Sequence, residues 1–217
     1  MFLELVDSLR CVRSHEDSWL IARADELDHR HIARGELGCP ICNARYAVRD
    51  GVADFSGAGR TSRASNSSAP PHDTRATALR AAALLALTDP GGLVVLAGDW
   101  SACADALLDL TEGVQLLALD PVPELRSGGA LSLALIPDVL PLAAASVRGI
   151  ALDAAHATPS LLAGAARALA PRARLIAPAS ALVPASLQEL ARDDEHWVAA
   201  AAPPSNVSAP VPIGIRR

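Results

Sequence analysis

The residues best suited to chemistry are cysteine and histidine side chains near the start of the chain. Cys39-Pro-Ile-Cys42 places two thiolates on one tight knuckle, while Cys11 and His15 add a third thiolate and an imidazole. This donor set suits tetrahedral zinc. Four protein ligands leave no open position for a substrate, so the sequence predicts a structural metal site.

Two points about this site stay open. His29 and His31 are near enough in sequence to replace His15 as the fourth ligand, although on a hairpin their side chains are expected to face solvent. The knuckle can also exist as a plain turn without metal. A redox-active cysteine pair is less consistent with the sequence, because no strand-knuckle-helix context like that of a thioredoxin surrounds it.

Short elements are expected to position these donors. Residues 2–10 are predicted to form an amphipathic helix that leads into Cys11. Residues 19–22 and 31–33 are predicted to be short strands of a hairpin around the polar run 23–30. Asp50-Gly51 is a tight-turn dipeptide between two further strands, 46–48 and 52–55.

The composition changes twice along the chain. Residues 1–55 are predicted to form the small metal-binding domain. Residues 56–73 are poor in large apolar side chains and rich in Ser, Gly and Pro, which predicts a flexible linker. Residues 74–217 then alternate helical and apolar-strand patterns, which predicts a second and larger domain.

The second domain is predicted to be an α/β fold with a Rossmann-like, doubly wound sheet, because apolar strands separated by helices indicate a parallel sheet covered on both faces. The predicted helices cover residues 74–87, 102–110, 160–169 and 184–192. The predicted strands cover residues 92–97, 114–119, 131–136, 147–152 and 173–177, followed by an antiparallel pair at 197–202 and 211–216.

Charge and hydropathy exclude several classes of function. A net charge of −5 argues against a general nucleic-acid binder, whose affinity comes mainly from a basic surface. The longest apolar region, residues 130–152, is interrupted by Asp138, Arg148 and two prolines, so no transmembrane helix is expected. The N-terminal residues lack the apolar stretch of a secretory signal, and clustered cysteines suit a reducing compartment, so we expect a cytoplasmic protein.

Residues 1–55 resemble the small zinc-ribbon activator proteins that bind and stabilise methyltransferases of the translation machinery. The resemblance rests on segments around the knuckle: Leu9-Arg10-Cys11, Gly35-Glu36-Leu37, Cys39-Pro40-Ile41-Cys42, Tyr46-Ala47-Val48 and Asp50-Gly51-Val52. His15 departs from the family, in which a second cysteine is common at this place. In that family the ribbon is an interaction partner and not a catalyst, so the resemblance implies a protein partner.

Residues 74–217 are similar in order to the class I S-adenosylmethionine-dependent methyltransferases. The stretch Leu140-Pro141 to Ser146-Val147 resembles the family's approach to its fourth strand. Ala168-Leu169-Ala170-Pro171 with Arg174-Leu175-Ile176 resembles the turn before the fifth strand. The resemblance implies a cofactor site at the carboxyl ends of the first strands.

The cofactor site itself departs from that family. Gly98 keeps the first glycine of the cofactor loop, but Trp100 and Ala102 stand where small residues should follow, and the indole is expected to occupy cofactor space. Asp120 follows the second strand, where it is either a ribose ligand or a turn residue before a proline. Asp138 lies two residues after the position at which the family tends to carry an aspartate that contacts the adenine.

These departures predict a pseudoenzyme. Losing two or three polar contacts of about 1–3 kcal/mol each lowers a micromolar cofactor affinity to about millimolar. We therefore expect a non-catalytic accessory subunit of a larger complex, with zinc as its cofactor and no tightly bound S-adenosylmethionine. The alternative is an active methyltransferase with a built-in activator, in which Gly98, Asp120 and Asp138 hold the cofactor. Asp153 and His156 are interpreted as solvated residues at a helix entry.

Overall fold

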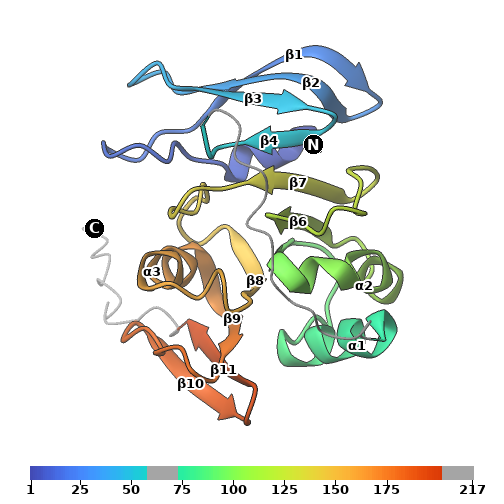
Figure 1. Ribbon diagram of the computed structural model, residues 1–217, viewed down its shortest axis with the longest axis vertical. Coiled ribbons are helices and arrows are strands. Elements are labelled where there is room, and N and C mark those ends of the chain that lie inside the picture. Colours follow the sequence, from blue (N-terminus) through green and yellow to red (C-terminus); the bar gives the residue numbers. More distant parts are fainter. Residues whose placement is uncertain (58–72, 202–217) are drawn as a thin grey trace, which may run out of the picture.

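The computed structural model describes residues 1–57 and 73–201, and in these residues every strand belongs to one sheet (Figure 1). The strand order is β1-β2-β3-β4-β7-β6-β5-β8-β9-β11-β10. The N-terminal strands are β1 (Ile21–Asp28), β2 (His31–Gly38), β3 (Arg45–Arg49) and β4 (Val52–Asp54). The later strands are β5 (Leu93–Ala97), β6 (Gln115–Leu119), β7 (Leu131–Leu135), β8 (Val147–Ala151), β9 (Leu169–Pro178), β10 (Leu187–Arg192) and β11 (His196–Ala201).

Strands β1 to β4 pair with one another in antiparallel register at one end of the sheet. Asp50 and Gly51 have φ of 51° and 75°, so the predicted turn between β3 and β4 adopts the left-handed backbone that suits a tight hairpin. Two local predictions need correction. The helix predicted at residues 2–10 is a 3-10 helix, η1, that covers only Leu3–Ser8. Most of the polar run predicted to lie between the two hairpin strands belongs to the strand β1.

Strands β7, β6, β5, β8 and β9 form the parallel part, and β11 is antiparallel between β9 and β10. The α-helices α1 (Thr74–Leu84) and α2 (Ala104–Leu110) pack on one face, and α3 (Pro159–Ala168) packs on the other. The side chains of β5 alternate between these faces: Val94 and Leu96 point toward α1 and α2, and Val95 and Ala97 toward α3. The predicted α/β, Rossmann-like fold is confirmed.

One predicted helix is wrong. Residues 184–192 contain the edge strand β10, which pairs with β11 in antiparallel register and exposes most of its residues. Its sequence, Leu-Gln-Glu-Leu-Ala-Arg, favours a helix, but pairing with β11 overrides that local preference. The other three helix predictions correspond to α1, to η2 (Gly98–Cys103) with α2, and to α3.

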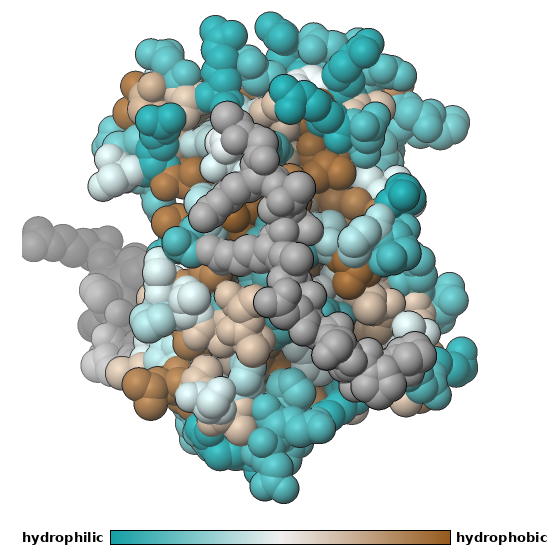
Figure 2. Space-filling model, viewed as in Figure 1, coloured by the Kyte–Doolittle hydropathy of each residue, from teal (hydrophilic) through white to brown (hydrophobic). Residues whose placement is uncertain are grey.

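Strands β1 to β4, called the ribbon strands below, join the Rossmann-like strands through the pairing of β4 with β7. These strands pair in parallel, with Val52 opposite Leu133 and Asp54 opposite Leu135. One apolar cluster continues across the junction, from Leu9 and Leu37 in the N-terminal part to Leu119 and other residues of the parallel strands. In Figure 2 the outer end formed by the β1–β2 hairpin is mostly hydrophilic, whereas apolar side chains gather toward the middle of the view.

The predicted linker, residues 56–73, lies mostly outside the described residues, and so does the predicted strand at 211–216. The division into domains at residues 1–55 and 74–217 stays a prediction. In the part of the chain that the structure describes, no helix is both long and apolar enough to cross a membrane.

Candidate functional site

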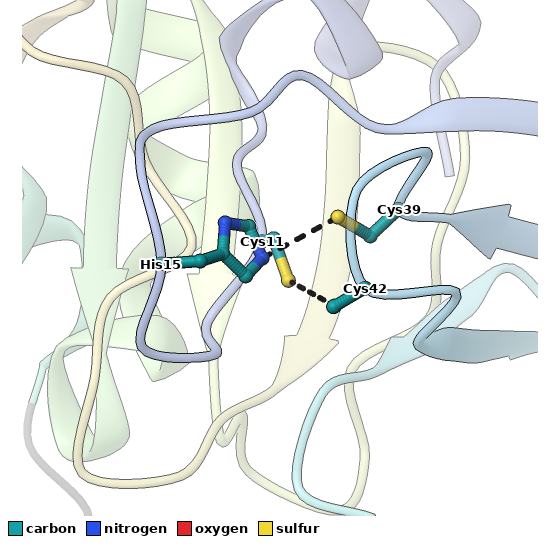
Figure 3. A group of neighbouring side chains, drawn as sticks. All are labelled: Cys11, His15, Cys39 and Cys42. Atoms are coloured by element: carbon teal, nitrogen blue, oxygen red, sulfur yellow. Dashed lines mark hydrogen bonds between the residues drawn. The ribbon is translucent and has the colours of Figure 1, made fainter.

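The four predicted metal donors come together at one end of the ribbon strands (Figure 3). Cys39 and Cys42 flank the turn between β2 and β3, while Cys11 and His15 lie in the loop between η1 and β1. The donor atoms all lie within 4.8 Å of one another. Cys11 Sγ is 3.7 Å from Cys42 Sγ, and Cys39 Sγ is 3.5 Å from His15 Nε2.

These separations fit a tetrahedral ion. Zinc–sulfur bonds of about 2.3 Å and zinc–nitrogen bonds of about 2.0 Å give tetrahedral edges of roughly 3.5 to 3.8 Å. Backbone bonds shape the turn, because Cys39 N–H donates to the carbonyl of Ala44 and Asn43 N–H donates to that of Cys39. Burial raises the pKa of the Cys39 thiol, but hydrogen bonds from the N–H groups of Cys42 and Ile41 outweigh it and hold the pKa at about 6.

Asp120, the candidate ribose ligand, is engaged by other residues of the chain. It directly follows β6, and only 4% of its surface is exposed. Its Oδ1 accepts a hydrogen bond of 3.1 Å from the backbone N–H of Ile136, and its Oδ2 lies 3.1 Å from Nε2 of His156. The opposite ring nitrogen of His156 lies 2.6 Å from Oδ1 of Asp153.

His156 therefore bridges two buried carboxylates, and its own side chain is fully buried. Burial alone lowers the pKa of a histidine, but the hydrogen bonds with Asp120 and Asp153 outweigh it and raise the pKa of His156 to about 9. The ring is thus an imidazolium at neutral pH, with both nitrogens donating. The charge-assisted bonds make this cluster a fixed part of the interior.

The space beside the loop after β5 is also occupied by a side chain of the same chain, that of Asp153. Gly98 has φ of 58°, and a Cβ at this position would overlap the carboxylate of Asp153. That same carboxylate accepts a hydrogen bond of 3.0 Å from the backbone N–H of Asp99. The buried hydroxyl of Ser101 donates to the Gly98 carbonyl at 2.6 Å and accepts from Val122 N–H at 3.0 Å, which ties the loops after β5 and β6 together.

A cavity of about 360 Å³ lies beside these loops, at the carboxyl ends of β5, β8 and β9. Asp99, Trp100, Asp153 and His196 are among the residues that line it. Trp100 is only 6% exposed and belongs to the apolar cluster beneath α1 and α2. In open α/β sheets this end of the strands is where ligands bind, so the cavity is the second candidate site.

No protein-family model matches the chain, and no curated protein sequence matches it. Among solved structures, it is similar to a complex between the Haloferax volcanii Trm112 methyltransferase activator and a putative methyltransferase. That match has a TM-score of 0.39 and 26% identity, and it covers 46% of this chain and 50% of the other.

Two further solved structures are similar to parts of the chain. An S-adenosyl-L-methionine methyl transferase from Silicibacter pomeroyi gives a TM-score of 0.43 at 15% identity, over 58% of this chain and 94% of its own. A putative sarcosine dimethylglycine methyltransferase from Galdieria sulphuraria gives 0.38 at 16% identity, over 48% of this chain and 45% of its own. The chain thus spans about half of the Haloferax volcanii and Galdieria sulphuraria chains that it matches.

The structure brings some of the predicted site residues together and separates others. Cys11, His15, Cys39 and Cys42 form one group. Gly98 and Asp120 are linked through Asp153 and His156, in the contacts described above. Asp138 is exposed in the loop after β7, where its carbonyl accepts a hydrogen bond from the Ser160 hydroxyl.

Sequence reasoning missed the role of Asp153 and His156. Both are buried, so their interpretation as solvated residues at a helix entry is wrong. The available signal was the pair Asp153-x-x-His156 directly after the apolar strand β8, where parallel strands present polar side chains at the same sheet edge as Asp120.

Proposed function

We propose that this chain is a non-catalytic accessory subunit, a methyltransferase-like scaffold with a structural zinc ion and no S-adenosylmethionine. One observation carries the proposal: Asp120, the residue best placed to bind the cofactor ribose, is buried and bonded to His156 and to Ile136 N–H. A ribose could reach that carboxylate only by displacing an imidazolium, which would leave a buried charge uncompensated. Breaking such a pair costs about 3–5 kcal/mol.

The loop after β5 supports the same proposal. A glycine in a cofactor loop allows the ligand to approach the backbone, but here the space above Gly98 holds the carboxylate of Asp153. The packing of Asp153 therefore explains why position 98 needs a glycine, and no cofactor is required for that explanation.

Zinc is proposed for the ribbon site because the donor set is three thiolates and one imidazole at tetrahedral separations. Cys11, His15, Cys39 and Cys42 would hold the ion, and no position would remain for a substrate. Its contribution is then to stability, on the order of 10 kcal/mol of binding free energy coupled to folding. We propose that the ribbon strands bind another protein within a larger complex, and that this complex is cytoplasmic.

The test is calorimetric titration of the zinc-loaded full chain with S-adenosylmethionine and with its demethylated product. The proposal expects no heat and no thermal stabilisation up to about millimolar cofactor. A dissociation constant below about 100 µM, some 5–6 kcal/mol, would overturn it. The Asp120→Asn variant is the matched control, because any binding that uses this carboxylate should weaken in it.

The alternative is an active methyltransferase with the ribbon as its built-in activator. The cavity beside Asp99 and Trp100 favours it, because it lies at the sheet edge where α/β enzymes bind ligands. In that function Gly98 and Asp120 hold the cofactor and Asp138 contacts the adenine. Methyl transfer that disappears in Asp120→Ala would support this alternative, whereas an inactive wild-type protein would leave the scaffold proposal in place.

A further inference from the structure

The hydroxyl of Tyr46 lies against one of the four metal donors. Its oxygen is 3.1 Å from Sγ of Cys11, which is 35 residues away in the chain. As a metal ligand Cys11 is a thiolate, which has no proton and can only accept a hydrogen bond. A tyrosine keeps its proton at neutral pH, because the ordinary pKa of the phenol is about 10. The hydroxyl of Tyr46 is therefore the donor and the sulfur is the acceptor.

The sheet and the core fix the position of this hydroxyl. Tyr46 lies on β3 opposite Leu37 of β2, and it is only 6% exposed. Its ring packs on that of Phe55, with centroids 4.9 Å apart and an interplanar angle of 41°. Cys11 lies in the loop between η1 and β1. The bond thus ties a ligand on a loop to a side chain that the core holds in place.

Backbone groups orient two of the other donors. The Cys39 sulfur accepts hydrogen bonds from the N–H groups of Cys42 and Ile41 on the knuckle. Nδ1 of His15 lies 2.6 Å from the carbonyl oxygen of Glu16. Because a carbonyl only accepts, Nδ1 carries the proton, and Nε2, the nitrogen that lies 3.5 Å from the Cys39 sulfur, is free to bind a metal.

The backbone supports the Cys11 sulfur less closely. The N–H of Arg13 donates to this sulfur at 3.5 Å, a longer distance than the 3.1 Å to the Tyr46 hydroxyl. A hydrogen bond to an ionised acceptor is stronger than one between neutral groups, and groups that orient metal ligands are worth about 10–100-fold in metal affinity. Tyr46 is thus well placed both to orient Cys11 and to reduce the charge on its sulfur.

We propose that Tyr46 is a positioning residue of the metal site, whose hydroxyl donates to the Cys11 thiolate and holds that thiolate in place for the ion. The inference rests on the proposed zinc site, and it adds a residue that does not itself bind the ion. Tyr46→Phe is the informative variant, because it removes the hydroxyl and keeps the ring against Phe55.

The test is cobalt substitution in the full chain, because Co²⁺ can replace zinc in a tetrahedral thiolate site and has an absorption spectrum that zinc lacks. Loss of the hydrogen bond raises the energy of the sulfur lone pairs. In Tyr46→Phe the thiolate-to-cobalt charge-transfer band should therefore move to longer wavelength, while the d–d bands keep their tetrahedral pattern. In a competition with a chelator, the zinc affinity of this variant should fall by at least about tenfold.

Phe55→Leu is the control for packing, since it removes the ring contact and keeps the hydroxyl. It should lower the free energy of unfolding and leave the charge-transfer band where it is. A double-mutant cycle gives a second measurement: in a Cys11→Ala background, Tyr46→Phe should cause no further loss of zinc affinity. Circular dichroism of the zinc-loaded variants checks that the fold is retained.

An unmoved band in Tyr46→Phe, an equal shift in Phe55→Leu, or an undiminished effect of Tyr46→Phe in the Cys11→Ala background would overturn the inference. These outcomes are distinguishable from a failure of the zinc proposal. A wild-type protein that binds neither zinc nor cobalt would refute both, whereas a wild-type protein that binds cobalt with the same spectrum as Tyr46→Phe would refute only this inference.

Discussion

The buried cluster of Asp120, His156 and Asp153 makes the stability of the protein depend on pH. The pKa of His156 rises from 6.5 in the unfolded chain to about 9 in the folded protein. Its stabilisation is therefore complete below pH 6.5 and is lost as the pH rises through about 9. The difference between these two pKa values corresponds to about 3 kcal/mol of unfolding free energy.

The measurement is urea unfolding, followed by circular dichroism, from about pH 6 to about pH 9.5, a window chosen to cover both pKa values. His156→Gln is the reference variant because its side chain is neutral throughout. Titration of the cysteines near the N-terminus contributes equally to both proteins, so the difference between them isolates His156. The advantage of the wild type should be largest at the acidic end and should decrease by most of about 3 kcal/mol at the alkaline end.

A second variant keeps the test informative if His156→Gln does not fold. His156→Gln leaves two buried carboxylates without their cation, which can cost about 3–5 kcal/mol. Asp120→Asn removes one carboxylate and keeps an oxygen that can accept from Ile136 N–H, so it should fold and show a weaker pH dependence than the wild type. A difference between wild type and either variant that is constant with pH would show that the folded protein holds His156 neutral, and would refute the ionic cluster.

Three further predictions follow from the same structure. Gly98→Ala should lower the free energy of unfolding by about 1–3 kcal/mol even without any cofactor, because φ of 58° and the Asp153 carboxylate both oppose a Cβ; an unchanged urea midpoint would contradict this. Elemental analysis should find one zinc ion per chain in the wild type and less in Cys39→Ser, while His15→Ala should weaken zinc binding in a competition with a chelator; equal metal content in all three would argue against the site. Leu9→Ala should cost about 2–5 kcal/mol, since Leu9 is fully buried in the apolar cluster that the two parts of the sheet share. Heating should then unfold the wild type in one transition, and two resolved transitions in calorimetry would contradict a shared core.

Much of the fold could be read from local patterns. Strand β5 is an uninterrupted apolar run and β6 is apolar after its first residue, and Asp50-Gly51 marks a turn because glycine tolerates a positive φ. The edge strand β10 could not be read in this way. One of its sides has no neighbour among the described strands and its residues are mostly exposed, so only its pairing with β11 distinguishes it from a surface helix.

The metal site and the cluster around His156 also differ in how far the sequence alone could predict them. The donors of the metal site are indicated by two short spacings, since Cys39 and Cys42 are three residues apart on one turn and Cys11 and His15 are four residues apart. The cluster around His156 depends on contacts between distant positions, and Asp120 lies 36 residues from His156 in the chain. From its position after the second strand and the resemblance to methyltransferases, Asp120 was either a ribose ligand or a turn residue. The fold instead supplies an imidazolium from the loop after β8. The position of both residues directly after parallel strands indicated a shared sheet edge, but it did not show that the two side chains are bonded to each other.

The pairing of β4 with β7 bears on where the proposed partner protein could bind. Had β4 been an edge strand, its unpaired backbone groups would offer a template for the sheet of another chain. Here Val52 to Asp54 are paired with Leu133 to Leu135, so the ribbon contacts the Rossmann-like strands of its own chain through that edge. Among the described strands, the sheet ends at β1 and β10. Substitutions at Val52 or Leu133 should therefore lower stability, whereas loss of a partner without loss of stability is expected only from changes elsewhere on the surface.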